Sequence, residues 1–251
     1  MSRFNLNSRD WLDTPERKRD YNRKHFAAAA AGYDRATIVM SLGRDRAWKR
    51  LLIDSLPDHP APRCLDLACG TGDICDLLAD RYPQGEIIGL DLTPEMLDMA
   101  RQRPHAGNIS FIEGDMAATG FEDASFDLIT GSYALRNAPR LDQALTEIRR
   151  LLKPGGSACF LDFARAESAP GRRLQYLLLR SWCGLWGRIL SGSWQVHGYI
   201  AESLARYPEP DRLQAMLDEA GLRPISRQSL FGGMMSLLRV ERPRETGGEE
   251  P

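Results

Sequence analysis

Two acidic residues and two glycines stand where the first two apolar runs of the sequence end. Asp66, Gly70 and Gly72 belong to the segment LDLACGTGD, and Asp91, in GLDLT, follows 25 residues after Asp66. Because glycine has no Cβ, the backbone at Gly70 and Gly72 can turn tightly and approach a ligand, while the next helix presents free amide groups. A carboxylate at Asp91 can accept hydrogen bonds from both hydroxyl groups of a ribose. The pattern therefore predicts a nucleoside site.

The charge beside this turn separates two kinds of nucleoside ligand. Dinucleotide-binding enzymes have the pattern GxGxxG, in which the third glycine lets the helix pack closely against the strand. This sequence has Cys75 at that position. Asp66 directs a negative charge at the turn, which disfavours a pyrophosphate and favours an amino group or a sulfonium ion. We therefore expect S-adenosylmethionine as the cofactor, and a methyltransferase rather than a dehydrogenase.

Two later segments add polar residues after apolar runs. Asp115 and Met116 follow the third run, where the Asp115 carboxylate can accept from an adenine amino group and the Met116 N–H can donate to the ring. The fourth run, FDLITGS, ends at Ser132, over the expected position of the transferred methyl group. Methyl transfer from a sulfonium is an in-line displacement, so the protein must align donor and acceptor and exclude water.

These residues depend on alternating strands and helices to bring them together. After Pro62 the alternation is typical of βαβ units and a mostly parallel sheet with helices on both faces. We expect strands at residues 63–68, 86–91, 109–113, 126–131, 157–163, 223–230 and 234–241. We expect helices at residues 73–82, 94–102, 141–152 and 209–220. The predicted fold is α/β and Rossmann-like, with seven strands and a ligand crevice beyond the carboxyl ends of the parallel strands.

The flanking segments complete one domain, expected over residues 25–242. Residues 1–24 are polar and charged, and we expect a flexible arm there. Two helices, one beginning at HFAAAAAGYD and one over residues 40–57, are expected to form an N-terminal cover. Residues 165–205 interrupt the alternation after the fifth strand and predict a helical insertion that covers the substrate. The tail 243–251 has no apolar content and is expected to be disordered.

Composition excludes several classes of function. The chain has 251 residues and a net charge of -1, so it lacks the excess of basic residues on which nucleic-acid binding depends. The five cysteines form no CxxC pair, so we expect neither a zinc site, nor another metal site, nor a disulfide framework. The start lacks the apolar core of a signal peptide, and no run of about 20 apolar residues occurs. A cytoplasmic protein is expected, and the composition leaves a homodimer open.

With these motifs identified, the sequence resembles the class I methyltransferases and, more closely, the ubiquinone/menaquinone C-methyltransferase family, over residues 25–240. The segments that carry the resemblance are AAAAAGYD, SLGRDRAWKR, LDLACGTGD, GLDLTPEML, ALRN, LLKPGG with LDF after it, GYIAESLARYP and LQAMLDEAGL. Family members use S-adenosylmethionine to methylate a ring carbon of a prenylated benzoquinol or naphthoquinol. The cofactor contacts that the resemblance implies are Thr71, Asp91, Asp115, Met116 and Ser132. We also expect Leu92, next to Asp91, to contact the cofactor.

This reaction needs groups that deprotonate the ring hydroxyl or stabilise its phenolate. Arg136 and Asn137 are the first candidates, as a fixed cation and an amide directed at the oxygen. Arginine keeps its proton because its pKa lies above about 12, so it is a poor proton acceptor, and we assign to Arg136 the stabilisation of the phenolate. The structural alternative is that Arg136 and Asn137 form a salt bridge and a helix cap. Tyr33, in the N-terminal cover, and His197, in the insertion, are further candidates, and a pKa near 6.5 suits histidine as a base. Asp162, which ends the fifth strand, also reaches the crevice by position.

The sequence departs from the family pattern at several positions. Ala36 and Thr37 replace the usual Met-Asn, Asp45 replaces a histidine ahead of Trp48, and Leu238 stands where the family often has histidine. These changes leave two alternatives for the function. One is an O- or N-methyltransferase of another small hydrophobic acceptor; the other is a noncatalytic cofactor-binding member of a biosynthetic complex.

The segment 171–190 is rich in leucine, tryptophan and arginine. One interpretation is an amphipathic cover that completes the core. The other is a tunnel for an isoprenoid tail, with arginines at its rim that meet an anionic membrane surface. On the second interpretation the partner is a prenylated quinol, and the protein sits peripherally at the inner face of the membrane.

Overall fold

Seven strands form one sheet within residues 13–191 and 194–244, the part of the chain that this computed structural model describes; side chains of residues 190–198 are outside the description. The strands are β1 (Arg63–Leu67), β2 (Glu86–Asp91), β3 (Ile109–Glu113), β4 (Phe126–Ser132), β5 (Leu152–Phe163), β6 (Arg223–Leu230) and β7 (Met235–Glu241). Their order is β3-β2-β1-β4-β5-β7-β6, and β7 alone of these seven runs in the opposite direction to the others. The predicted seven-stranded, mostly parallel sheet is confirmed.

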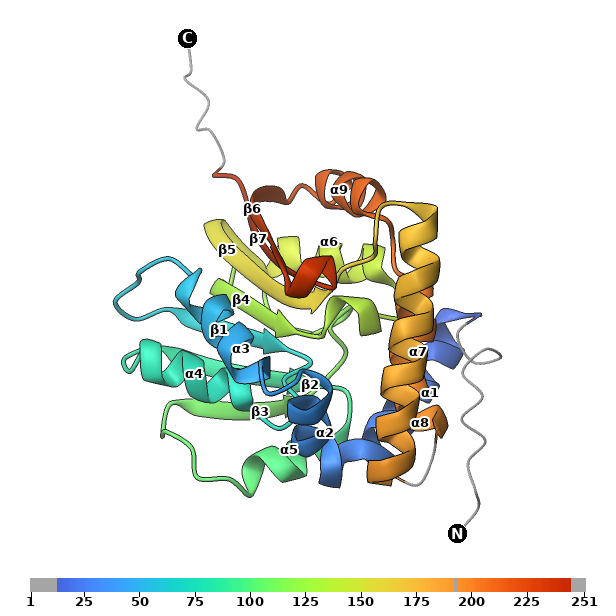
Figure 1. Ribbon diagram of the computed structural model, residues 1–251. Helices are drawn as coiled ribbons and strands as arrows, with labels where there is room; N and C mark the ends of the chain where they lie inside the picture. Colours follow the sequence, from blue (N-terminus) through green and yellow to red (C-terminus); the bar gives the residue numbers. More distant parts are fainter. Residues whose placement is uncertain (1–12, 192–193, 245–251) are drawn as a thin grey trace.

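Helices cover both faces of the sheet and the edge at which the parallel strands end (Figure 1). They are α1 (Pro15–Ala29), α2 (Tyr33–Met40), α3 (Asp45–Asp54), α4 (Asp73–Arg81), α5 (Pro94–Arg101), α6 (Leu141–Leu151), α7 (Ala169–Ser191), α8 (Trp194–Arg206) and α9 (Pro210–Glu219). Helices α3 and α4 pack on one face through residues such as Leu52 and Leu78, and α6 and α9 pack on the other through Leu145 and Leu217. Short 3-10 turns lie at Ala30–Gly32, Leu135–Asn137 and Phe231–Gly233.

The N-terminal segment differs from its prediction, because residues 15–24 belong to α1 rather than to a flexible arm. Thr14 caps the helix by accepting from the Arg17 N–H, and Pro15 stands at the first turn, where proline is tolerated. Tyr21 is fully buried, with its ring centroid 5.1 Å from that of Tyr199 on α8. Because Tyr21 stands alone in a charged stretch, the sequence shows no apolar periodicity there, and the helix was not predicted. Residues 1–12 of the predicted arm and 245–251 of the predicted tail lie outside the described residues.

The segments beside β1 and β5 also differ in detail from their predictions. The helix expected over residues 40–57 is shorter than predicted, because α2 extends to Met40 and α3 covers only Asp45–Asp54. Strand β5 begins at Leu152 rather than at residue 157 and contains the turn residues of KPGG, with a register irregularity against β4. Neither difference moves the carboxyl ends of the strands.

The predicted insertion forms a helical hairpin, α7 and α8, across the carboxyl edge of the sheet (Figure 1). Trp182 of α7 donates to the Met40 carbonyl oxygen of α2 at 3.2 Å. Tyr199 of α8 donates to the Asn22 side chain of α1 at 2.6 Å. The hairpin and the N-terminal helices therefore form one cover over the strand ends. In the described part of the chain, no helix combines the length and apolar character needed to cross a bilayer.

Candidate active site

A cavity opens where β1, β2, β3 and β4 end, and we call it the nucleoside cavity. Six of the nine residues predicted to bind the cofactor line it: Gly70, Asp91, Leu92, Asp115, Met116 and Ser132. They converge because the carboxyl ends of parallel strands meet at one edge of the sheet. Phe26 of α1 and Tyr33 of α2 close this cavity from the side of the cover.

Asp91, the last residue of β2, is the central acceptor of the nucleoside cavity. Its Oδ2 accepts from the Gly70 N–H at 2.9 Å and its Oδ1 from the Thr93 N–H at 2.8 Å. Burial raises the pKa of Asp91, and these backbone donors oppose the rise. A carboxylate offers about four lone-pair sites, so two remain for ligand hydroxyl groups. The geometry suits a ribose.

The glycine turn approaches the same cavity with strained backbone. Gly70 has φ +55, and a Cβ placed there would meet no protein atom within 4 Å. Ala68, which also lines the cavity, has φ 53, a left-handed conformation that alanine rarely adopts. Strained residues of this kind gather at ligand sites, where the surrounding structure holds them. The open space beside Gly70 is therefore room for a ligand.

One hydroxyl group in the wall of the nucleoside cavity is unsatisfied. Ser132 Oγ is buried and has no hydrogen-bond partner within the described part of the chain. Since buried hydroxyl groups in proteins are nearly always paired, this one fits a ligand group. Asp115 Oδ1 accepts from the Ala117 N–H at 2.9 Å, and its Oδ2 lies 3.4 Å from Arg19 Nε of α1.

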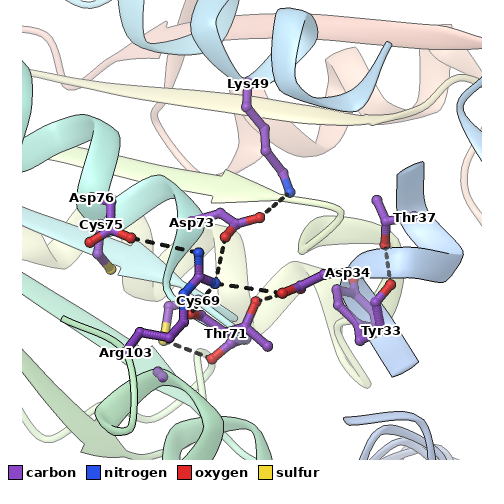
Figure 2. A network of polar contacts seen from close by, with 12 residues as sticks. Tyr33, Asp34, Thr37, Lys49, Cys69, Thr71, Asp73, Cys75, Asp76 and Arg103 are labelled. Atoms are coloured by element: carbon purple, nitrogen blue, oxygen red, sulfur yellow. Dashed lines mark hydrogen bonds and ion pairs between the residues drawn. The ribbon is translucent and has the colours of Figure 1, made fainter. Parts of the chain in front are cut away.

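Thr71 and Gly72, also predicted to contact the cofactor, shape the turn without lining the cavity. Thr71 Oγ1 donates to Asp34 Oδ1 of α2 at 2.8 Å. Figure 2 shows Arg103 between Asp34 and the α4 residue Asp73; its guanidinium donates to the Thr71 carbonyl oxygen at 3.0 Å and to Asp73 at 2.7 Å. This polar clamp ties the N-terminal cover to the glycine turn.

Asp66 occupies a different position from the one predicted. It is 1% exposed; its carboxylate accepts from Thr130 Oγ1 at 2.8 Å and from Cys75 Sγ at 3.8 Å, and it does not line the nucleoside cavity. Side chains alternate along a strand, so Asp66 shares the face of Cys64, beneath α4. Burial raises the pKa of Asp66 to about 7. The residue supports the turn from below rather than facing a ligand.

A second, apolar cavity of about 280 Å³ lies between the N-terminal helices and the α7–α8 hairpin. Its walls are mostly aromatic and aliphatic, and four residues line both cavities: Phe26, Tyr33, Tyr133 and Asn137. A donor in the nucleoside cavity and an acceptor in the apolar cavity would therefore meet at these residues. Of the four, Phe26 and Tyr133 were missed by sequence analysis.

Arg136 supplies a buried cation to the wall of the apolar cavity. It is 4% exposed, its Nε lies 3.4 Å from Asp162 Oδ1, and its guanidinium also donates to Ser203 Oγ. Its Cζ lies 5.4 Å from the centre of the Phe163 ring and 5.8 Å from that of Tyr199. These contacts fix the guanidinium beside two aromatic rings, and its ion pair with Asp162 is the salt bridge that the sequence left open as the structural alternative.

Asn137 is held by the protein on both sides of its amide group. Its Nδ2 donates to the Tyr133 carbonyl oxygen at 2.7 Å, and its Oδ1 accepts from Tyr199 Oη at 3.0 Å. Lys18 of α1 donates to the backbone carbonyl oxygens of Arg136 and Ala138, at 3.0 and 2.6 Å. Helix α6 has no side-chain cap, so Asn137 does not serve as one. These bonds fix the turn that carries Arg136.

Of the remaining predicted catalytic residues, the structure describes the side chain of Tyr33 but not that of His197. Tyr33 lines both cavities, and burial raises its pKa to about 12. His197 belongs to the segment whose side chains lie outside the described residues, so its prediction stays a prediction. Tyr133, which sequence analysis missed, has φ 59 and donates to Asp45 Oδ1 at 2.7 Å. The 88 residues that separate this pair in the sequence explain why no local signal pointed to it.

The sheet order, the buried Asp91 carboxylate at the end of β2 and the adjoining apolar cavity are those of a class I S-adenosylmethionine-dependent methyltransferase. The model of the ubiE/COQ5 methyltransferase family matches residues 15–240. The chain belongs to this family.

Curated relatives cover most of the chain. It is 38% identical to the demethylmenaquinone methyltransferase of Deinococcus radiodurans, over 82% of this chain and 87% of that protein. It is 36% identical to the 2-phytyl-1,4-naphtoquinone methyltransferase of Thermosynechococcus vestitus, over 86% and 97%. It is 32% identical to the ubiquinone/menaquinone biosynthesis C-methyltransferase UbiE of Ectopseudomonas mendocina, over 92% and 93%.

Solved structures support the fold. A putative methyltransferase from Haloferax volcanii, in complex with the Trm112 activator, aligns with a TM-score of 0.62 at 20% identity, over 87% of this chain and 98% of that one. A putative methyltransferase from Bacillus halodurans aligns with a TM-score of 0.61 at 17% identity, over 78% and 99%. Both share the architecture of the sheet and its helices with this chain.

Proposed function

We propose that this protein transfers a methyl group from S-adenosylmethionine to a ring carbon of a prenylated benzoquinol or naphthoquinol, a step in ubiquinone or menaquinone biosynthesis. The observation that carries the proposal is the meeting of the nucleoside cavity and the apolar cavity at Phe26, Tyr33, Tyr133 and Asn137. An apolar ring beside a methyl donor is what this arrangement accommodates. The names of the relatives, all concerned with quinone methylation, agree with it.

The cofactor supplies an electrophilic methyl group on a sulfonium. In our proposal Asp91 accepts from both ribose hydroxyl groups, and the open space beside Gly70 takes the neighbouring part of the ligand. Asp115, Leu92 and Met116 hold the adenine ring at the far end of the nucleoside cavity. Ser132 Oγ, buried without a protein partner, accepts or donates a hydrogen bond to the ligand. Asp66, Thr71 and Gly72 shape this site from outside the cavity wall.

The acceptor ring needs an electron-rich carbon, which ionisation of the neighbouring hydroxyl group provides. We assign to Arg136 the stabilisation of the developing phenolate, because its guanidinium is fixed and almost fully buried in the wall of the apolar cavity. Asn137 and Tyr33 position the ring at the junction of the cavities. His197 keeps its proposed role as a base on sequence grounds alone.

In our proposal α7 contacts the membrane and guides the prenyl tail into the apolar cavity. Apolar side chains spaced three and four apart are exposed on this helix: Leu174, Leu177, Leu178, Trp182, Leu185 and Ile189. Leu178 and Trp182 also line the apolar cavity, so the exposed stripe continues into it. Arg173, Arg180 and Arg188 are exposed along the same helix. Such a face suits a bilayer with anionic head groups, and each buried CH₂ of the tail contributes about 0.8 kcal/mol.

The proposal is tested with purified protein, methyl-labelled S-adenosylmethionine and four acceptors, namely benzoquinols and naphthoquinols with and without a prenyl tail. We expect label on a ring carbon of a tailed quinol, located by mass spectrometry and NMR, and a much higher KM for the tailless compound. Label on oxygen or nitrogen would assign the protein to another acceptor class. Binding of the cofactor without transfer to any quinol, even in membrane extract, would indicate a noncatalytic member.

A further inference from the structure

We infer that Tyr133, Asp45, Lys49 and Asp73 form a proton relay from the junction of the two cavities to the solvent. The inference rests on the proposed function, because the relay needs an acceptor whose ring hydroxyl group loses a proton. It assigns the proton acceptor to a pair of residues, Tyr133 and Asp45, rather than to Arg136 or His197.

Tyr133 stands where the relay would begin. It follows β4, lines both cavities and is held by its N–H, which donates to the Leu161 carbonyl oxygen at 2.7 Å. Its φ of 59 is a left-handed conformation that tyrosine rarely adopts and that surrounding contacts must maintain. The hydroxyl group donates to Asp45 Oδ1 at 2.7 Å. A second hydrogen bond, accepted by the Tyr133 oxygen, remains available to a substrate hydroxyl group.

A buried ion pair continues the chain of contacts. Asp45 Oδ2 lies 2.7 Å from Lys49 Nζ, and the two side chains are only 7% and 9% exposed. Lys49 Nζ donates to Asp73 Oδ2 at 3.2 Å, and the Asp73 side chain is 31% exposed (Figure 2). Burying an ion pair rarely adds to stability, because desolvation of both charges offsets their attraction. Its position beside the cavity junction points to chemistry rather than to packing.

The charges around the relay keep two of its members, Lys49 and Tyr133, protonated. Burial would lower the pKa of Lys49, but Asp45 and Asp73 outweigh it and raise that pKa, so Lys49 stays an ammonium. Burial and then the Asp45 charge raise the pKa of Tyr133, so Tyr133 stays a hydroxyl group that passes a proton on. The Asp45 and Lys49 charges act on Tyr33 of α2, and Asp162 of β5 acts on Tyr133.

Each step of the relay moves one proton from a donor oxygen or nitrogen to the next acceptor. The substrate O–H bond breaks, its electron pair stays on the ring oxygen, and the proton goes to the Tyr133 oxygen. The Tyr133 O–H bond breaks at the same time, and its proton goes to the Asp45 carboxylate. After the carboxyl group rotates, Asp45 passes a proton to Lys49 as Lys49 passes one to Asp73. Asp73 releases that proton to water, and every member of the relay returns to its starting state.

The test compares Tyr133→Phe and Asp45→Asn with wild type in methylation of a tailed quinol. Tyr176→Phe is the matched control, because Tyr176 donates to Glu202 at 2.6 Å on the α7–α8 hairpin and lines neither cavity. We expect kcat to fall about 100-fold in both relay variants, the usual size of a general-base contribution. We expect KM for the quinol and the affinity for S-adenosylhomocysteine to stay unchanged, and the control to keep the wild-type kcat.

The pH profile separates a relay from a structural role. Without an internal acceptor, only substrate that is already ionised reacts, so kcat of the Tyr133→Phe variant should rise with pH towards the pKa of a phenol, about 10. A kcat that falls equally at every pH, together with weaker binding of S-adenosylhomocysteine, would overturn the relay. So would a wild-type kcat in the Tyr133→Phe variant, which can be assayed even if Asp45→Asn does not fold. Absence of quinol methylation by wild type would instead overturn the proposed function and the relay with it.

Discussion

Replacing Gly70 with alanine adds one methyl group at the turn between β1 and α4. The added Cβ meets no protein atom within 4 Å, because the space beside it belongs to the nucleoside cavity. Any steric effect of the methyl group therefore falls on a ligand. Gly120→Ala is a matched control, because Gly120 has φ +77, equally open surroundings and no place in either cavity.

The two substitutions should lower the stability of the protein equally but differ in their effect on cofactor affinity. A left-handed conformation costs an alanine about 1–2 kcal/mol, so both variants should lose that much stability. Such a loss lowers Tm by roughly 2–8 °C in a chain of this size. Forcing a methyl group into a filled site costs about 1–3 kcal/mol, so Gly70→Ala should weaken cofactor binding by roughly 5- to 150-fold.

Thermal melting of the free proteins measures the loss of stability. Calorimetric titration with S-adenosylmethionine or S-adenosylhomocysteine measures the loss of affinity. The expected pattern is an equal fall in Tm for both variants and a loss of affinity in Gly70→Ala alone. Wild-type affinity in Gly70→Ala would refute the assignment of the nucleoside cavity to the cofactor. Equal losses of affinity in both variants would show that backbone strain, not the methyl group, is responsible.

Three further predictions concern other parts of the site. Arg136→Lys keeps a charge but loses the planar fork, so kcat should fall on the order of 100-fold while S-adenosylhomocysteine affinity is unchanged; an unchanged kcat would contradict phenolate stabilisation. Leu177→Glu, on the exposed face of α7, should reduce sedimentation with anionic vesicles about 10-fold, whereas Ile225→Glu on β6 should not; equal effects would refute the docking face. The folded-state pKa of Asp66 is raised from 3.8 to about 7, so between those values the folded state binds the proton that the unfolded state releases, and stability falls as pH rises through this window. In urea unfolding, the stability of Asp66→Asn relative to wild type should therefore be higher at pH about 8 than at pH about 4. The variant Asp58→Asn, at an exposed residue, should show no such change.

The sequence predicted those parts of the site that a short segment determines. Gly70, Asp91 and Ser132 line the nucleoside cavity because each ends or follows a parallel strand, and strand ends are recognisable in a βαβ pattern. Asp66 was placed wrongly because its motif was considered without the alternation of its strand. Cys64, two residues earlier, packs in the core beneath α4, and Asp66 shares that face.

Long-range contacts account for the rest. Helix α1 is stabilised by Tyr21 and Asn22, whose partner Tyr199 lies 177 residues beyond Asn22. The pair of Tyr133 and Asp45 likewise joins segments that lie 88 residues apart in the sequence. Composition and periodicity describe one segment at a time, so neither contact was predictable from them.

The apolar stripe on α7 has a consequence for how turnover depends on substrate. A protein that collects its acceptor from a lipid phase responds to the mole fraction of quinol among the lipids rather than to its amount per litre. Adding inert phospholipid to vesicles while total quinol stays constant should therefore slow the reaction, as two-dimensional dilution lengthens each search. The rate of quinone maturation would then follow the lipid content of the membrane as well as the supply of methyl donor.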